Sequence, residues 1–234
     1  MININIKKGL THEIYQTIFY PKKMSEKMNN TPHWLKMAFF IQILSILYPY
    51  INQRLIYFSF QWIIPQKLFG IVKNTLNESF FKTILYTIIH FYLEVFLLSG
   101  FIFFILSLFH QVQFKKVILL IIYGELILFF IQPLLTLILI IKNLYGITNL
   151  KDLSISIGLE VIFPKINKSS FLNMVLMNVN VITLWWVIYL NFGLEVLLNL
   201  KKMVRLFYII VIFCFYFFVQ YFITLINKIF LITL

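Results

Sequence analysis

Three ionisable residues, His90, Glu94 and Glu125, lie inside long apolar runs of the sequence. A carboxylate near the middle of a membrane span costs about 2.5–3.5 kcal/mol on insertion scales, so each carboxylate is a candidate functional site. His90 and Glu94 have the i, i+4 spacing that brings side chains together on one helix face. Glu94 and Glu125 lie on either side of a polar hinge at residues 110–116, and helical rise places them within roughly 9 Å of each other in depth. We therefore expect one intramembrane polar cluster.

Two interpretations of this cluster are open. Its side chains could relay protons or bind a cation in a small transporter or channel, because intramembrane titratable groups mark such pathways. Alternatively, these side chains hydrogen-bond to one another, or to Tyr86 or Tyr92, only because buried polar groups need hydrogen-bond partners. The second interpretation, in which the cluster holds helices together, is the one we favour.

The composition shows what kind of protein must carry these residues. Of 234 residues, 61% are hydrophobic and 12% are charged, whereas soluble domains have about 45–50% apolar and about 25% charged residues. This indicates an integral membrane protein. The net charge is +12, but the basic residues flank apolar runs, as anchors beside anionic headgroups do. We expect the lipid bilayer as a partner, and no nucleic acid.

The apolar runs predict an all-α, polytopic transmembrane helix bundle. Each of five runs is long enough to cross the hydrocarbon layer at about 1.5 Å per residue. Gly124 and Pro133 could kink the third run. Residues 55–81, interrupted by Pro65 and Gly70, predict an interfacial elbow, with a re-entrant segment as the alternative. The five spans are expected at residues 34–51, 83–109, 117–141, 171–200 and 206–226, within a transmembrane domain of residues 34–234.

Residues 1–33 predict a cytoplasmic amphipathic segment without a cleavable signal peptide. Leu10, Ile14 and Ile18 recur at helical spacing, which is typical of a short helix lying on the membrane surface. Pro21 should end this helix, and a basic turn should follow. Both short turns on the same side of the bundle are also basic, so the positive-inside rule places the N-terminus inside. The candidate lipid-binding or topogenic residues are Lys22, Lys23, Lys115, Lys116, Lys201 and Lys202.

The sequence carries no signature of an enzyme. It has no His-Glu-x-x-His, no Gly-x-Ser-x-Gly and no Gly-rich phosphate-binding loop. The remaining histidines have no acidic companions at ligand spacing, so we expect no metal, no cofactor and no catalytic residue. Cys214 is the only cysteine, which excludes an intramolecular disulfide. We expect Glu195 to reach towards Lys201 and Lys202, and Ser99, Gly100 and Gly193 to admit close helix neighbours.

Three stretches resemble the Yip1 domain family, especially its short bacterial branch. Residues 17–24 followed by Trp34 and Leu35 look like a proline-basic step before the family's first span. Residues 114–133 look like its turn from the second to the third span, with Tyr123-Gly124-Glu125 leading to Pro133. Residues 180–202, with Leu184-Trp185-Trp186 and Lys201-Lys202, look like its fourth span and basic exit.

The resemblance implies a five-span, non-enzymatic accessory or scaffold protein of the bacterial plasma membrane. It implies a partnership with subunits of an ABC-type exporter, or protection (immunity) against membrane-active peptides, or a homo-oligomer. The family's eukaryotic role with small GTPases depends on a long N-terminal region, which has no counterpart in residues 1–33. A small transporter or channel that uses His90, Glu94 and Glu125 is the competing hypothesis.

Overall fold

The computed structural model describes residues 10–27, 34–63, 66–144, 158–159, 162 and 170–233, and within them it contains helices and no strand. This confirms the predicted all-α fold. In chain order the helices are α1 (Leu10–Phe19), α2 (Pro21–Lys27), α3 (Trp34–Ile63), α4 (Gln66–Ser107), α5 (Phe114–Phe129), α6 (Ile131–Leu144), α7 (Ser170–Asn178), α8 (Val181–Leu198) and α9 (Lys202–Thr233).

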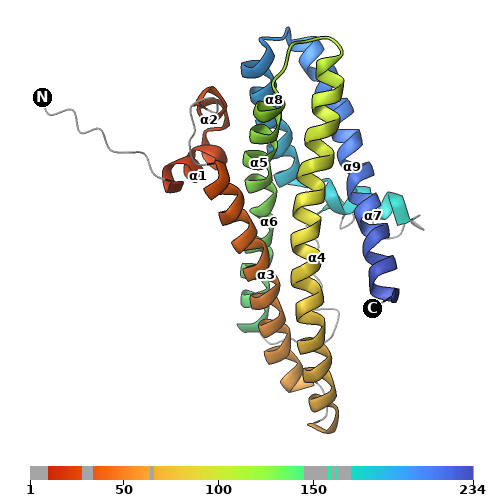
Figure 1. Cartoon of the computed structure of the whole chain (residues 1–234). Helices are drawn as coiled ribbons and strands as arrows, with labels where there is room; N and C mark the ends of the chain where they lie inside the picture. The colour runs from red at the N-terminus through yellow and green to blue at the C-terminus, as the bar shows by residue number, and fades with distance from the viewer. Residues whose placement is uncertain are drawn as a thin grey trace, which may run out of the picture.

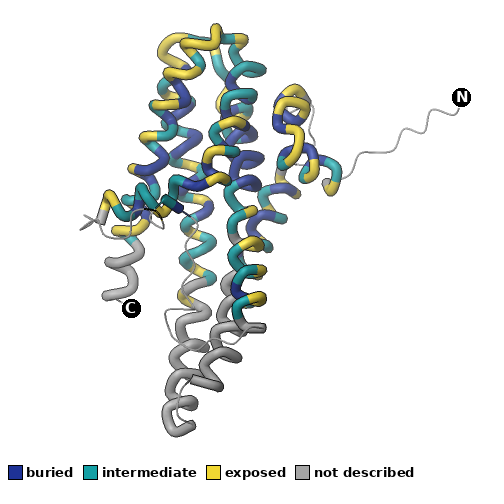
Figure 2. Tube along the Cα trace, turned by 180° about the vertical axis from the view of Figure 1, so that it is seen from behind, coloured by how far each residue is buried: buried dark blue, intermediate teal, exposed yellow. Residues whose placement is uncertain are grey.

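Helix α5 is the centre of the bundle (Figure 1). It packs against α1, α3, α4 and α8, while α9 packs against α4 and α8, and α6 against α3. Every residue from 119 to 127 is buried, and Figure 2 shows buried residues concentrated along the inner helices. Any polar side chain in this part of α5 must therefore face another helix of the same chain.

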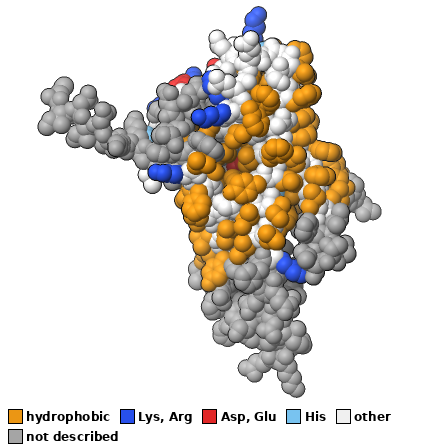
Figure 3. Space-filling view, in the orientation of Figure 1, with side chains coloured by type: hydrophobic (Ala, Val, Ile, Leu, Met, Phe, Trp, Pro, Cys, Tyr) orange, Lys and Arg blue, Asp and Glu red, His pale blue; other side chains and the backbone are white. Residues whose placement is uncertain are grey.

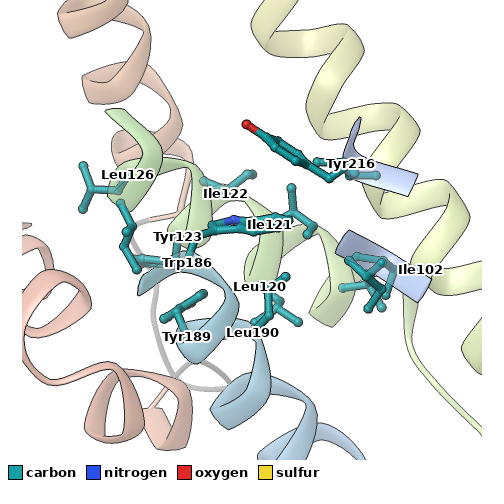
Figure 4. Packing of buried hydrophobic residues seen from close by; sticks show 14 of the residues in the cluster. Ile102, Leu120, Ile121, Ile122, Tyr123, Leu126, Trp186, Tyr189, Leu190 and Tyr216 are labelled. Atoms are coloured by element: carbon teal, nitrogen blue, oxygen red, sulfur yellow. The ribbon is translucent and has the colours of Figure 1, made fainter. Parts of the chain in front are cut away.

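Two glycines allow α5 and α8 to approach each other closely. A Cβ atom on Gly124 would lie 2.8 Å from Nε1 of Trp186, and a Cβ atom on Gly193 would overlap Leu120. Figure 4 shows the large side chains of α5 and α8, including Trp186, filling this interface. The expectation for Gly193 is confirmed. It is wrong for Gly100, because nothing lies within 4 Å of its added Cβ atom.

Among the described residues, four segments are long and apolar enough to cross a membrane: Ile84–Ser107, Phe114–Lys142, Val181–Leu198 and Lys202–Ile226. The run predicted at residues 34–51 contains a shorter apolar stretch, Leu35–Leu47. Figure 3 shows many hydrophobic side chains on the middle of the described surface of the bundle. An apolar surface of this kind suits contact with lipid, so the chain is a multi-pass membrane protein.

The segment predicted as an interfacial elbow, residues 55–81, is helical over its described residues, while its place at the membrane interface and the re-entrant alternative stay predictions. Helix α3 continues to Ile63, and α4 already begins at Gln66. Gly70 lies within α4, which packs along α3. Tertiary packing of two long helices overrides the weak helix propensity of a single glycine.

The third predicted span is divided at Phe130, where α5 ends and α6 begins. The N–H of Phe130 bonds to Ile127 O at 3.1 Å. Pro133 lies three residues further on and cannot donate the next helical hydrogen bond back along the chain, which explains the interruption. Gly124 does not interrupt α5.

The fourth predicted span, residues 171–200, is not one helix. Helix α7 ends at Asn178, and α8 starts after Asn180, whose side chain accepts hydrogen bonds from the N–H groups of Ile182 at 2.9 Å and Thr183 at 3.0 Å. Thr183 completes a capping box with Asn180. Asn178 lies at the end of one helix and Asn180 caps the start of the next. The apolar pattern alone did not predict this break between two helices.

The N-terminal helix is confirmed, but its surroundings differ from the expectation. Pro21 is the first residue of α2, a position where its missing N–H has no cost. Lys22 and Lys23 therefore lie on a helix, exposed, and not in a turn. Helices α1 and α2 pack against α5 and α8 respectively.

Candidate intramembrane polar site

His90 and Glu94 meet on α4 as their spacing predicts. His90 Nε2 lies 3.7 Å from Glu94 Oε2. The His90 ring stacks on Tyr86 with a centroid distance of 5.5 Å, and its side chain is 29% exposed, while Glu94 is buried. His90 is therefore the outer member of the site.

Gln220 on α9 supplies the second contact of Glu94. Its side-chain N–H donates a hydrogen bond to Glu94 Oε1. One oxygen of Glu94 thus contacts a residue of its own helix, α4, and the other contacts a residue of α9. This contact ties α4 to α9 at the depth of the carboxylate.

Glu125 enters the same site from α5. It is 1% exposed, and it lies close enough to Glu94 for an electrostatic interaction. Tyr216 on α9 interacts electrostatically with both carboxyl groups. Glu125 Oε1 is buried and has no hydrogen-bond partner among the described residues. The structure therefore brings His90, Glu94 and Glu125 together where α4, α5 and α9 meet.

Two adjacent buried carboxyl groups limit the charge that the site can hold. Two uncompensated negative charges in a low-dielectric interior are costly, and groups that interact strongly bind and release protons as a pair. A proton, a protonated His90 or a small cation would each relieve this cost. The arrangement can thus either pin three helices together or bind a positive charge.

The sequence reasoning missed Gln220 and Tyr216. Gln220 is the only amide within the apolar run of residues 206–226, and a lone amide in a membrane span commonly bonds across helices. The isolated position of Gln220 in this apolar run could therefore have identified it as a candidate site residue. No sequence pattern distinguishes Tyr216, because tyrosines are frequent throughout this sequence.

The other predicted residues lie apart from the site. The partner of Glu195 is Arg205, at 2.8 Å, and not Lys201 or Lys202 as expected; Arg205 also donates to Asn191 at 2.7 Å. The prediction failed because Arg205 is one turn inside α9, where it reaches back across the turn. Lys115, Lys116, Lys201 and Lys202 all lie at one end of the bundle, at the starts of α5 and α9 (Figure 1).

Within the described part of the chain, no three His, Cys, Asp or Glu side chains are arranged to hold a metal ion. Cys214 is exposed on α9. The site therefore consists of His90, Glu94 and Glu125 with Gln220 and Tyr216 around them.

Comparison with protein families identifies the domain to which the chain is similar. The model of the Yip1 domain matches residues 15–224, a range that runs from α1 into α9 and includes the whole polar site. No curated protein and no solved structure matches the chain. Since the matched range covers most of its length, the chain belongs to the Yip1 domain family.

Proposed function

We propose that this protein is a non-enzymatic accessory or scaffold protein that assembles with another integral membrane protein. The observation that carries the proposal is the enclosed helix α5, whose carboxylate lies between α4 and α9 and is surrounded by the chain's own helices. Two carboxyl groups enclosed in this way, Glu94 and Glu125, support a rigid bundle better than an open pathway. Polar contacts between membrane helices stabilise such bundles.

The finer parts of the proposal rest on the family resemblance. The protein is placed in the plasma membrane of a bacterium, with five spans and its N-terminus inside. We infer that its partner is an ABC-type exporter subunit or a second copy of the chain, or that the protein confers protection (immunity) against membrane-active peptides. The exposed apolar side chains of α4 and α9 are compatible with such a neighbour, because membrane helices associate through surfaces of this kind.

Purification in mild detergent tests the assembly. We expect the tagged full-length chain to co-purify with exporter subunits in constant ratio, and the deletion strain to become more sensitive to membrane-active peptides. A chain that always purifies alone, together with unchanged peptide sensitivity of the deletion strain, would contradict the proposal.

A second candidate function is the conduction of protons or small cations across the membrane. The observation that favours it is Glu125 Oε1, which is buried beside Glu94 without a hydrogen bond among the described residues. A carboxylate oxygen that finds no donor in the protein is available to a proton or a small cation.

Reconstitution into liposomes distinguishes the two functions. If the site conducts, Glu94→Gln and Glu125→Gln will each abolish pH-dependent flux, measured with an entrapped pH-sensitive dye. If it only holds helices, neither variant will change flux, and both will shift the thermal unfolding temperature. Glu195→Gln is the matched control, because Glu195 pairs with Arg205 away from the site.

A further inference from the structure

Helix α1 buries polar residues against the bundle, beside Ile14 and Ile18, which pack against the hydrophobic core. Glu13, Gln16 and Thr17 are buried, whereas Tyr15, Phe19 and Tyr20 are exposed. A helix that only lay on a membrane surface would direct its polar side towards water. Helix α1 instead directs it towards α5, and its aromatic residues face outward.

Two hydrogen bonds hold α1 in place. The Tyr123 hydroxyl on α5 donates to Glu13 Oε2 at 3.0 Å. Trp185 Nε1 on α8 donates to the backbone carbonyl of Ile18 at 2.7 Å. The second bond satisfies one of the carbonyl groups that the end of any helix leaves unpaired. We call Tyr123, Trp185 and the neighbouring Tyr189 the α1 seat.

The seat lies well along the length of the bundle. Tyr123 is nine residues after Phe114, the first residue of α5, which corresponds to about 14 Å along the helix axis. Figure 1 accordingly shows α1 beside the bundle and away from the end that carries the turn between α4 and α5. Helix α1 therefore covers polar groups of α5 and α8 along the side of the bundle.

Docking of α1 leaves polar atoms unsatisfied. Tyr189 OH and His12 Nε2 are buried and lack a hydrogen-bond partner among the described residues. Tyr189 interacts electrostatically with Tyr123, and Figure 4 shows the two residues on neighbouring helices of the same core. A buried polar atom without a partner costs free energy, so the docked position of α1 carries this cost at His12.

Helix α1 is also short, with 10 residues. Isolated helices of this length are marginal in water, and segments held by few contacts open before the rest of a protein does. By contrast, α5 is buried along most of its length. The two parts of the structure should therefore open independently.

We propose that α1 is a reversible latch on the bundle, held closed by the bonds from Tyr123 and Trp185. Lifting the latch uncovers the α1 seat, a polar surface within the bundle that is suited to an amphipathic helix carrying a carboxylate, as α1 does with Glu13. The proposal depends on the contacts of α1 alone and stands whether or not a partner protein is found.

Cysteine accessibility in the full-length protein tests the latch. In a Cys214→Ser background, Thr17→Cys reports on the inner side of α1, Tyr15→Cys on its exposed side, and Ser99→Cys on the core of α4. The rate of reaction with a water-soluble maleimide is measured in detergent. We expect Thr17→Cys to react more slowly than Tyr15→Cys and faster than Ser99→Cys.

The seat is then weakened by Tyr123→Phe, with Glu13→Leu, which removes the acceptor, as the second variant if the first does not fold. Loss of this hydrogen bond should raise the rate at Thr17→Cys about fivefold or more and leave the rate at Ser99→Cys unchanged. Tyr208→Phe is the matched control, because Tyr208 is a buried tyrosine on α9 whose ring contacts His110. It should change neither rate.

Three outcomes would overturn the latch. Thr17→Cys could stay as protected as Ser99→Cys in every variant, which would make α1 a permanent part of the core. Both positions could become reactive together, which would indicate general unfolding. Thr17→Cys could react as fast as Tyr15→Cys in the background protein, which would mean that α1 is not docked.

Discussion

At the scale of single residues, Glu94 depends most on its neighbours. His90 and Gln220 each approach one of its oxygens, and Glu125 lies beside it. Within a membrane span, water is not available to replace a hydrogen-bond donor that a mutation removes. The amide of Gln220 should therefore contribute to stability and not only to geometry.

Replacing Gln220 by Met removes the donor and keeps a similar volume. We expect this variant to lose about 1–3 kcal/mol of stability, because it leaves a buried carboxylate oxygen without its donor. Thermal unfolding in detergent, followed by tryptophan fluorescence, measures the loss. Thr224→Val is the control on the same helix, since the Thr224 hydroxyl is exposed and bonds only to Gln220 O within α9. Equal effects of the two changes would argue against a special role for Gln220.

At the scale of helices, α5 and α8 are joined by close packing at two glycines. Gly193 lies against Leu120, and Gly124 against Trp186. Capping by Asn180 fixes the start of α8, and the left-handed backbone of Asn199, with φ of 49°, fixes its end. The length of α8 and its distance from α5 are thus both set by a few side chains.

Gly193→Ala should destabilise the protein, because the added methyl group overlaps the fully buried Leu120. Overpacking of this kind costs typically about 1–3 kcal/mol. Gly100→Ala places the same methyl group in open space and should be neutral or stabilising by up to about 1 kcal/mol, the difference in helix propensity. The unfolding temperature should fall for Gly193→Ala and stay the same or rise for Gly100→Ala. Equal shifts in the two variants would mean that α5 and α8 do not pack as described.

Much of this level of structure could be predicted from the sequence, and some could not. The apolar runs predicted the helices, and the i, i+4 rule predicted the His90–Glu94 pair. The contact of Gln220 with Glu94 joins residues 126 positions apart, so no local pattern contains it. The docking of α1 was likewise hidden, because Leu10, Ile14 and Ile18 suggested contact with lipid, whereas Ile14 and Ile18 pack against the core of the bundle and Glu13 bonds to Tyr123. Tertiary partners decide which face of a short helix is buried.

At the scale of the whole molecule, the basic residues mark one end. Lys115, Lys116, Lys201 and Lys202 gather at the end where α4 turns into α5 and α8 into α9. The ion pair between Arg205 and Glu195 closes the second of these turns. The positive-inside rule then predicts that this end faces the cytoplasm.

Labelling with an impermeant maleimide tests the orientation. In the Cys214→Ser background, Lys82→Cys, just before the span Ile84–Ser107, should react on intact cells. Gln111→Cys, in the turn between α4 and α5, should react only after permeabilisation. Both residues are exposed. The reverse pattern would invert the proposed orientation.

Helix α4 is 42 residues long, of which the apolar segment Ile84–Ser107 accounts for 24. The preceding residues, 66–83, account for about 27 Å of its length, and α4 packs against α3. Small helical membrane proteins are difficult to align in electron cryo-microscopy because a lipid disc hides their features. We predict that the end of the α3–α4 pair projects from one face of the disc and serves as an alignment marker, so that images can be oriented without a bound antibody fragment.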